Sequence, residues 1–184
     1  MLIATIALFE VALLGIAMTV IHLANLSAET AATPLNLGVG LAVGLALAGA
    51  ATVLLRGKGA FSRRLRRDFD TVLEIGQKFS LLDMAFVSLL AGLCEEALFR
   101  GGLQLWLTRP LGPAGAIAVA ALAFGAAHVV SVPYVVAATI IGAVLGATFH
   151  LTGSLAAAMI AHAGYDFVLF WWGLRLRGRA PSGG

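Results

Sequence analysis

Several ionisable side chains of this sequence stand inside apolar stretches, where they could do chemistry. Glu95, Glu96 and Arg100 lie in the middle of about 28 mostly apolar residues, 80–107. One such group at the centre of a membrane helix costs about 2.5–3.5 kcal/mol. Three of them together cost about 8–10 kcal/mol before compensation, which is comparable to the net stability of a typical domain. We therefore expect these groups to be paired, to face a water-filled cavity and to serve a reaction.

The two neighbouring carboxylates are expected to have different tasks. Glu96 and Arg100 are four residues apart with the acid first, an order that favours an ion pair on one helix face. Glu95 stands five residues from Arg100 and is expected to point away from that pair. We interpret Glu96 and Arg100 as structural, and Glu95 as the free carboxylate that could act as a general base near neutral pH.

Two later apolar stretches carry a histidine one helical turn from a second polar or aromatic residue. Phe124 and His128 would share one helix face, and His162 and Asp166 would share another. A carboxylate one turn from an imidazole can orient it or share a ligand with it. Each histidine taken alone is more often a packing residue. Three neighbouring helices that aim carboxylates and imidazoles inward, however, have the composition of a site that activates water.

The composition places these residues in a membrane protein. The 184 residues are 60% hydrophobic and only 11% charged, with a mean hydropathy of +0.98, whereas globular chains average roughly 25% charged residues. Too few charges are present to cover a soluble domain of this size. The length suits one domain of about six spans of about 20 residues each. We therefore predict an all-α fold, a polytopic membrane bundle of about six transmembrane helices with a basic interfacial segment.

Six apolar stretches are long enough to cross a membrane, and polar, proline or glycine turns separate them. The first is interpreted as an uncleaved span rather than a signal peptide, because it lacks a basic region in front of it. In the second, Gly40, Gly44 and Ala48 have the spacing that lets helices approach closely. The predicted spans are 2–26, 35–55, 80–107, 114–130, 134–149 and 155–174.

The chain divides into four predicted parts. Residues 1–56 form two transmembrane helices, 57–79 a basic cytoplasmic or interfacial segment, 80–174 a four-helix catalytic core, and 175–184 a basic cytoplasmic tail. Apolar residues recur at roughly helical spacing within the basic segment, which is typical of a helix on a membrane surface. The net charge of +3 is therefore assigned to contacts with anionic lipid and not to nucleic acid.

Lysine and arginine positions predict the orientation in the membrane. With both termini inside, the cytoplasmic side holds ten of the twelve basic residues and the opposite side holds only Arg109. This asymmetry favours N-in and C-in topology, here in a bacterial inner membrane. Glu10, His22 and His150 are expected to be packed, water-linked or structural groups, the last in a turn. The single Cys94 offers no disulfide framework.

The order and spacing of the polar motifs resemble those of a known family. The three motifs are Glu95-Glu96-x-x-x-Arg100, Phe124-x-x-x-His128 and His162-x-x-x-Asp166. Their series resembles the signature of the CPBP intramembrane proteases, which comprise CAAX prenyl endopeptidases and bacteriocin-processing enzymes and are also called the Abi family. The resemblance covers residues 80–174, roughly half the chain. The first two helices and the basic segment lie outside it.

This resemblance implies an endopeptidase that hydrolyses a peptide bond in a hydrophobic, lipid-modified or membrane-anchored peptide tail. It implies that Glu95 and His128 bind and deprotonate the attacking water. His162 and Asp166 would stabilise the oxyanion or complete a metal site. The family commonly has Asn at the last position, and an ionised Asp166 cannot donate a hydrogen bond. Asp166 is therefore protonated, orients His162 or favours a cation. Site support is implied for Glu96, Arg100 and Phe124.

The resemblance leaves the cofactor open between Zn²⁺ and a metal-free glutamate mechanism. Glu95, His128 and His162 with an open water position would suit zinc, although the sequence has no H-E-x-x-H motif. The expected partners are membrane lipid and a hydrophobic or lipidated peptide or protein substrate. Two other functions stay open, namely a non-catalytic membrane scaffold or binding protein and a small ion or proton carrier. No inverted repeat supports the carrier.

Overall fold

The computed structural model describes residues 1–177, so most of the predicted basic tail lies outside the described residues. The described part is helical, which confirms the predicted all-α class. A single 3-10 turn (η1) and a π-helical segment (η2) interrupt the α-helices. The elements are α1 (Leu2–Leu23), α2 (Pro34–Arg56), α3 (Ala60–Ile75), η1 (Gly76–Lys78), α4 (Leu81–Glu96), η2 (Ala97–Gln104), α5 (Leu105–Ala127), α6 (Val132–Thr152) and α7 (Leu155–Arg177).

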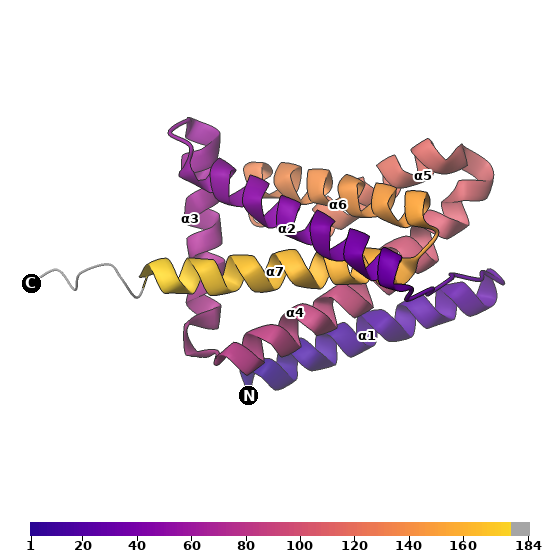
Figure 1. Ribbon diagram of the computed structural model, residues 1–184, viewed down its shortest axis with the longest axis horizontal. Helices are drawn as coiled ribbons and strands as arrows, with labels where there is room; N and C mark the ends of the chain where they lie inside the picture. The colour runs from indigo at the N-terminus through magenta and orange to yellow at the C-terminus, as the bar shows by residue number, and fades with distance from the viewer. Residues whose placement is uncertain (178–184) are drawn as a thin grey trace, which may run out of the picture.

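Five continuous helices of the described chain are long and apolar enough to cross a membrane. One of them, Leu81–Ala127, has 47 residues and would be about 70 Å long if straight, more than twice the apolar thickness of a bilayer. It reverses at Gly112, whose φ of 68° suits glycine, between Pro110 and Pro113. This helix therefore makes two crossings. The start of α1 and the end of α7 lie at the same end of the bundle (Figure 1), as six crossings require.

Several predicted helix boundaries were wrong by two or three residues. The first and fourth spans end at Leu23 and Ala127, not at 26 and 130. The fifth span begins at Val132 and not at 134, because Ser131 caps it and Pro133 falls in its first turn, where the missing N–H costs nothing. It ends at Thr152 and not at 149, because Gly153 in the left-handed conformation stops it. His150 is therefore an exposed residue of α6 and does not lie in a turn.

Helix α7 lies at the centre of the bundle, between α2 and α4 (Figure 1). Small residues permit the close contacts on both sides. A Cβ atom added at Gly44 of α2 would stand 2.7 Å from the Ala161 carbonyl oxygen of α7. One added at Gly92 of α4 would stand 2.8 Å from the Met159 carbonyl oxygen. The predicted close approach through small residues of the second span is confirmed, and it fixes where α7 holds its polar side chains.

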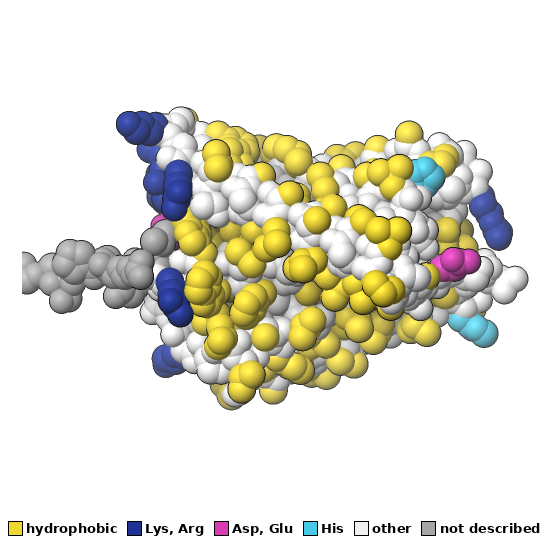
Figure 2. All heavy atoms as spheres, in the orientation of Figure 1, with side chains coloured by type: hydrophobic (Ala, Val, Ile, Leu, Met, Phe, Trp, Pro, Cys, Tyr) yellow, Lys and Arg dark blue, Asp and Glu magenta, His cyan; other side chains and the backbone are white. Residues whose placement is uncertain are grey.

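Helix α3 crosses the end of the bundle instead of running along it (Figure 1). Its inner face buries Leu65 and Leu73, while Arg63, Arg66 and Arg67 are exposed. Lysine and arginine side chains gather at this end of the molecule (Figure 2). The predicted amphipathic basic segment therefore folds as a helix with one apolar and one cationic face.

Candidate active site

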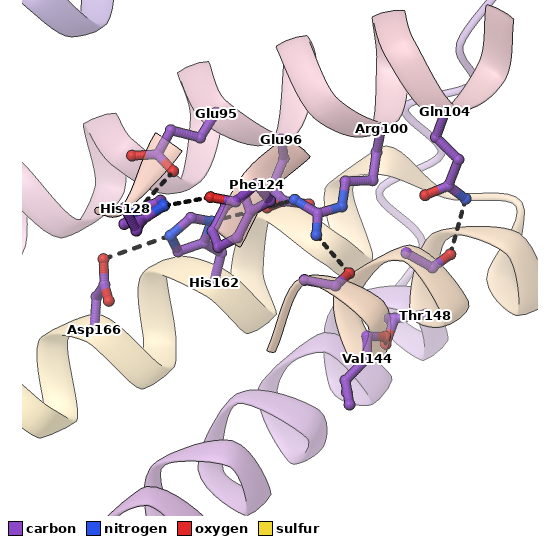
Figure 3. A network of polar contacts seen from close by, with 12 residues as sticks. Glu95, Glu96, Arg100, Gln104, Phe124, His128, Val144, Thr148, His162 and Asp166 are labelled. Carbon is purple, nitrogen blue, oxygen red and sulfur yellow. Dashed lines mark hydrogen bonds and ion pairs between the residues drawn. The ribbon is translucent and has the colours of Figure 1, made fainter. Parts of the chain in front are cut away.

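A cavity of about 260 Å³ lies within the bundle. Its polar wall combines Glu95 of α4, His128 just after α5, and His162 and Asp166 of α7. The remaining lining is mainly apolar, with Tyr134 of α6 and Tyr165 of α7 each adding a hydroxyl. The structure thus brings the four predicted catalytic side chains, from three separate crossings, onto one cavity (Figure 3).

Glu95 and His128 face each other across this cavity. Glu95 Oε2 lies 3.6 Å from His128 Nε2, and the two side chains are 12% and 28% exposed. The other ring nitrogen, Nδ1, lies 2.8 Å from the Phe124 carbonyl oxygen. A carbonyl can only accept, so Nδ1 carries a hydrogen and a neutral His128 presents the Nε2 lone pair to Glu95. Their separation exceeds that of a direct hydrogen bond.

Glu96 leaves α4 about 100° further around the helix than Glu95, and its carboxylate binds two donors. Its Oε1 accepts hydrogen bonds from Arg100 Nη1 at 2.7 Å and from His162 Nδ1 at 2.8 Å. All three side chains are almost completely buried. The predicted Glu96–Arg100 ion pair is confirmed. The bond to His162 was not predicted, and it means that Glu96 orients this imidazole from another helix.

Arg100 and Gln104 connect η2 to the backbone of α6. Arg100 Nη2 donates to the Gly142 carbonyl at 2.6 Å, and Gln104 Nε2 donates to the Gly146 carbonyl at 3.0 Å. The Arg100 guanidinium also lies 4.8 Å from the centre of the Phe124 ring, within cation–π range. The row of polar side chains along η2 thus ties the site to α6 (Figure 3).

Phe124 occupies the space between the two imidazoles. Its ring centre lies 4.5 Å from that of His128 and 5.7 Å from that of His162, and only 1% of the residue is exposed. A ring at this position fixes where both imidazoles stand. This placement agrees with the predicted supporting role of Phe124, and the role itself stays a prediction.

The π-helical segment η2 was not predicted. It begins directly after Glu96 and contains Arg100, Gly101, Gly102 and Gln104. The two glycines face α1, where Val20 and Ile21 lie within contact distance of an added Cβ atom. Such wide turns occur frequently at functional sites. The Gly-Gly pair inside an apolar span is the only local signal that could have indicated it.

His162 stands between two carboxylates. Nδ1 is bonded to Glu96, and Nε2 lies 3.5 Å from Asp166 Oδ2, whose side chain is 23% exposed. The Tyr165 ring stacks on the imidazole with 5.2 Å between centres and an angle of 11°. Asp166 faces the imidazole at a longer distance than Glu96 does, so Glu96 supplies the tighter of the two contacts.

The predicted zinc ligands do not form a metal site as the structure arranges them. Among the described residues, no three His, Cys, Asp or Glu side chains gather closely enough to hold a metal ion. Glu95 and His128 approach each other, but both ring nitrogens of His162 face other carboxylates. The zinc prediction therefore stays a prediction.

One buried carboxylate near the site was assigned no role from the sequence. Glu10 of α1 is 5% exposed, and its Oε2 has no hydrogen-bond partner among the described residues. It interacts electrostatically with Glu95, His128 and His162. Its signal in the sequence is that it is the one Asp, Glu, Lys or Arg in the first apolar stretch. His22, by contrast, is exposed.

Comparison with known proteins finds one family. The sequence model of the family described as type II CAAX prenyl endopeptidase Rce1-like matches residues 77–168, half of the chain. The matched segment contains all four polar residues of the cavity wall and the Glu96–Arg100 pair, whereas α1, α2 and α3 lie outside it. No curated protein and no solved structure matches the chain.

Proposed function

Because the chain belongs to the Rce1-like family of type II CAAX prenyl endopeptidases, we propose that it cleaves a peptide bond in a hydrophobic, lipid-modified or membrane-anchored peptide tail. The family and the apolar helices make it an integral membrane protein of the CAAX endopeptidase type. One observation supports the reaction most directly. A carboxylate and an imidazole from different crossings, Glu95 and His128, face each other at 3.6 Å on the cavity.

In the proposed first step, Glu95 and His128 activate a water molecule. Ionised Glu95 and neutral His128 each present a lone pair to the space between them. One water molecule can therefore donate one hydrogen bond to the carboxylate and one to the imidazole. Water commonly bridges polar atoms at such separations. Glu95 takes one proton as general base while the water oxygen bonds to the scissile carbonyl carbon.

His162 is proposed to stabilise the oxyanion that this attack creates. Glu96 accepts from Nδ1, which leaves Nε2 at the cavity as the second ring donor when His162 is protonated. A donor held in advance where negative charge develops is the arrangement that lowers such barriers. Asp166 faces the same nitrogen and is proposed to hold its hydrogen until the substrate carbonyl arrives.

Collapse of the tetrahedral intermediate completes the reaction. The proton on Glu95 is transferred to the leaving nitrogen, the C–N bond breaks, and the oxyanion returns its electrons to the carbonyl. The carboxylate is then ready for the next water. The second hydrogen of the water stays on the new carboxyl group of the product, which releases it as a proton when it ionises.

We propose N-in and C-in topology in a bacterial inner membrane, with α3 at the cytoplasmic surface. The cations of α3 gather at the end of the molecule where α1 begins and α7 ends (Figures 1 and 2), and cytoplasmic loops carry such an excess of Lys and Arg. A cysteine-accessibility assay on intact cells, with cysteines placed at exposed Arg67 and Arg109 in a Cys94→Ala background, tests this orientation. Labelling of the Arg67 position from outside would contradict it.

Purified protein in detergent tests the function. Lipidated CAAX-type peptides are offered to wild type, Glu95→Gln and His128→Ala, with Glu29→Gln in the exposed α1–α2 loop as the matched control. We expect each site variant to lose about 10²–10⁴-fold in kcat and the control to keep full activity. Unchanged cleavage by the site variants would overturn the mechanism. The metal content of the same preparation, and activity after chelation, test the zinc prediction.

The wild-type result also distinguishes the second open function. A folded wild-type protein that binds such peptides without cleaving any of them would support a scaffold or binding role, in which the site variants change association and not hydrolysis.

A further inference from the structure

The cavity continues well beyond its polar wall. Past the carboxylates and imidazoles it is bounded by apolar side chains from α2, α3 and α7. We call this part the apolar arm, and its residues are Leu55, Leu65, Phe69, Val72, Leu169 and Phe170. One cavity thus joins a reactive end to an apolar end.

The arm extends toward the end of the bundle that α3 crosses. On α4 the lining goes from Glu95 back to Val87, and on α7 it goes from His162 on to Phe170. Eight residues of helix span about 12 Å. Because α4 begins and α7 ends beside α3 (Figure 1), both measures place the arm between the reactive groups and α3.

Helix α3 is a fixed wall of this arm. Leu73 is 1% exposed, and a Cβ atom added at Gly173 of α7 would stand 2.6 Å from its Cδ1. Asp68 is buried and accepts a hydrogen bond from the Ser131 hydroxyl, three residues after His128. Packing on α7 and this polar link to the start of α6 hold the apolar face of α3 against the cavity.

We propose that α3 determines which substrate lipid the enzyme accepts, with the hydrocarbon chain lying in the apolar arm against Leu65, Phe69 and Val72. This inference rests on the proposed function. A scissile carbonyl beside Glu95 leaves the arm as the continuous apolar space for the rest of the substrate. The six residues that define the arm include no charged or polar side chain, which suits a hydrocarbon chain better than a peptide backbone, whose N–H and C=O groups would find no partners there.

Helix α3 lies outside the family match at 77–168. The reactive residues therefore lie within the matched segment, while the wall that meets the hydrocarbon chain lies outside it. We expect changes in α3 to alter substrate choice and leave the chemistry intact.

Peptides of one sequence, carrying thioether-linked hydrocarbon chains of increasing length, test the inference. The measurement is the ratio of kcat/KM for a long chain to that for a short chain. We expect Phe69→Ala to raise this ratio about tenfold and Val72→Phe to lower it by a similar factor, since small volume changes in apolar pockets discriminate on this scale. Because both substrates meet the same preparation, a smaller folded fraction cancels from the ratio.

Phe61→Ala is the matched control. Phe61 is on the same helix, is 39% exposed and does not line the cavity. Its ratio is expected to stay within about twofold of wild type. A wild-type enzyme that cleaves the peptides, with the ratio unchanged in both Phe69→Ala and Val72→Phe, would overturn the inference and leave the proposed function standing.

A binding measurement keeps the two proposals separable. Glu95→Gln protein is photolabelled with the same peptide carrying a diazirine at the end of its hydrocarbon chain, and the labelled segment is identified by mass spectrometry. We expect competable label within residues 65–72, whether or not the wild type shows turnover. Label confined to another helix, or label on α3 only when the diazirine is on the peptide, would overturn the inference. Label on α3 without wild-type turnover would instead overturn the proposed function.

Discussion

Glu95 and Glu96 are neighbours in the sequence, yet they serve two unlike regions of the molecule. Around Glu96, which is fully buried, the contacts to Arg100 and His162 are 2.7 and 2.8 Å long. Around Glu95, which is 12% exposed, the nearest charged or imidazole partner is His128 at 3.6 Å. The first region is a tight, dry network, and the second opens on a cavity.

The contacts around Glu96 hold the helices in place, whereas those around Glu95 are free to change during a reaction. A buried ion pair is costly to break, because removing one partner leaves the other charge uncompensated. A carboxylate at the edge of a cavity can instead change partner and protonation state as substrate and water enter. We therefore propose that Glu96, Arg100 and Gln104 form the frame and that Glu95 and His128 form the reactive face.

Exchange of the two carboxylates for amides, one at a time, tests this comparison most strongly. Glu95→Gln is expected to lower kcat about 10²–10⁴-fold with little change in the thermal midpoint, since no tight bond is lost. Glu96→Gln is expected to lower the thermal midpoint as well. The two variants are compared by peptide cleavage and by unfolding in detergent. Equal loss of stability in both would erase the distinction between frame and reactive face.

Removal of the frame cation gives the next largest effect. Arg100→Met is expected to lower the free energy of unfolding by about 3–5 kcal/mol, because Glu96 is left as an uncompensated buried charge. The double variant Glu96→Gln/Arg100→Met should recover a large part of this loss. Unfolding titrations in mixed micelles measure both. A double variant no more stable than Arg100→Met would show that the charge is not the cause.

The spacing between α4 and α7, which sets how the frame meets His162, can be changed by one methyl group. Gly92→Ala places a Cβ atom 2.8 Å from the Met159 carbonyl and 2.9 Å from Ala163, so the helices must separate. We expect a loss of about 1–3 kcal/mol in unfolding free energy. Gly164→Ala on α7 is the control, because it meets open space and is expected to be neutral or slightly stabilising.

The smallest effect is expected at the far end of the frame. Gln104→Ala removes the bond to the Gly146 carbonyl, and interhelical hydrogen bonds in membranes are worth about 0.6 kcal/mol on average. Thr108→Val is the control, since its hydroxyl bonds only to the Gln104 carbonyl one turn earlier. If Gln104→Ala lowered the free energy of unfolding by more than about 2 kcal/mol, Gln104 would stabilise the frame nearly as much as Arg100 does.

Much of this arrangement could be predicted from the sequence, because it depends on local patterns. Hydropathy located the crossings, and the four-residue spacing of Glu96 and Arg100 identified their ion pair. The contact between Glu96 and His162, 66 positions apart, could not be predicted, because it depends on how closely Gly92 lets α7 approach. The same holds for α3, whose pattern indicated a surface helix but not the cavity that it covers.

Arg100 and Gln104 are four residues apart, and so are the two carbonyls of α6 to which they bind, at Gly142 and Gly146. These two hydrogen bonds, one helical turn apart, fix the position of α6 along η2. Adding or deleting one residue of α6 between these carbonyls would rotate one of them by about 100° away from its donor. We therefore expect a one-residue insertion or deletion to be tolerated better in the loops than in this part of α6.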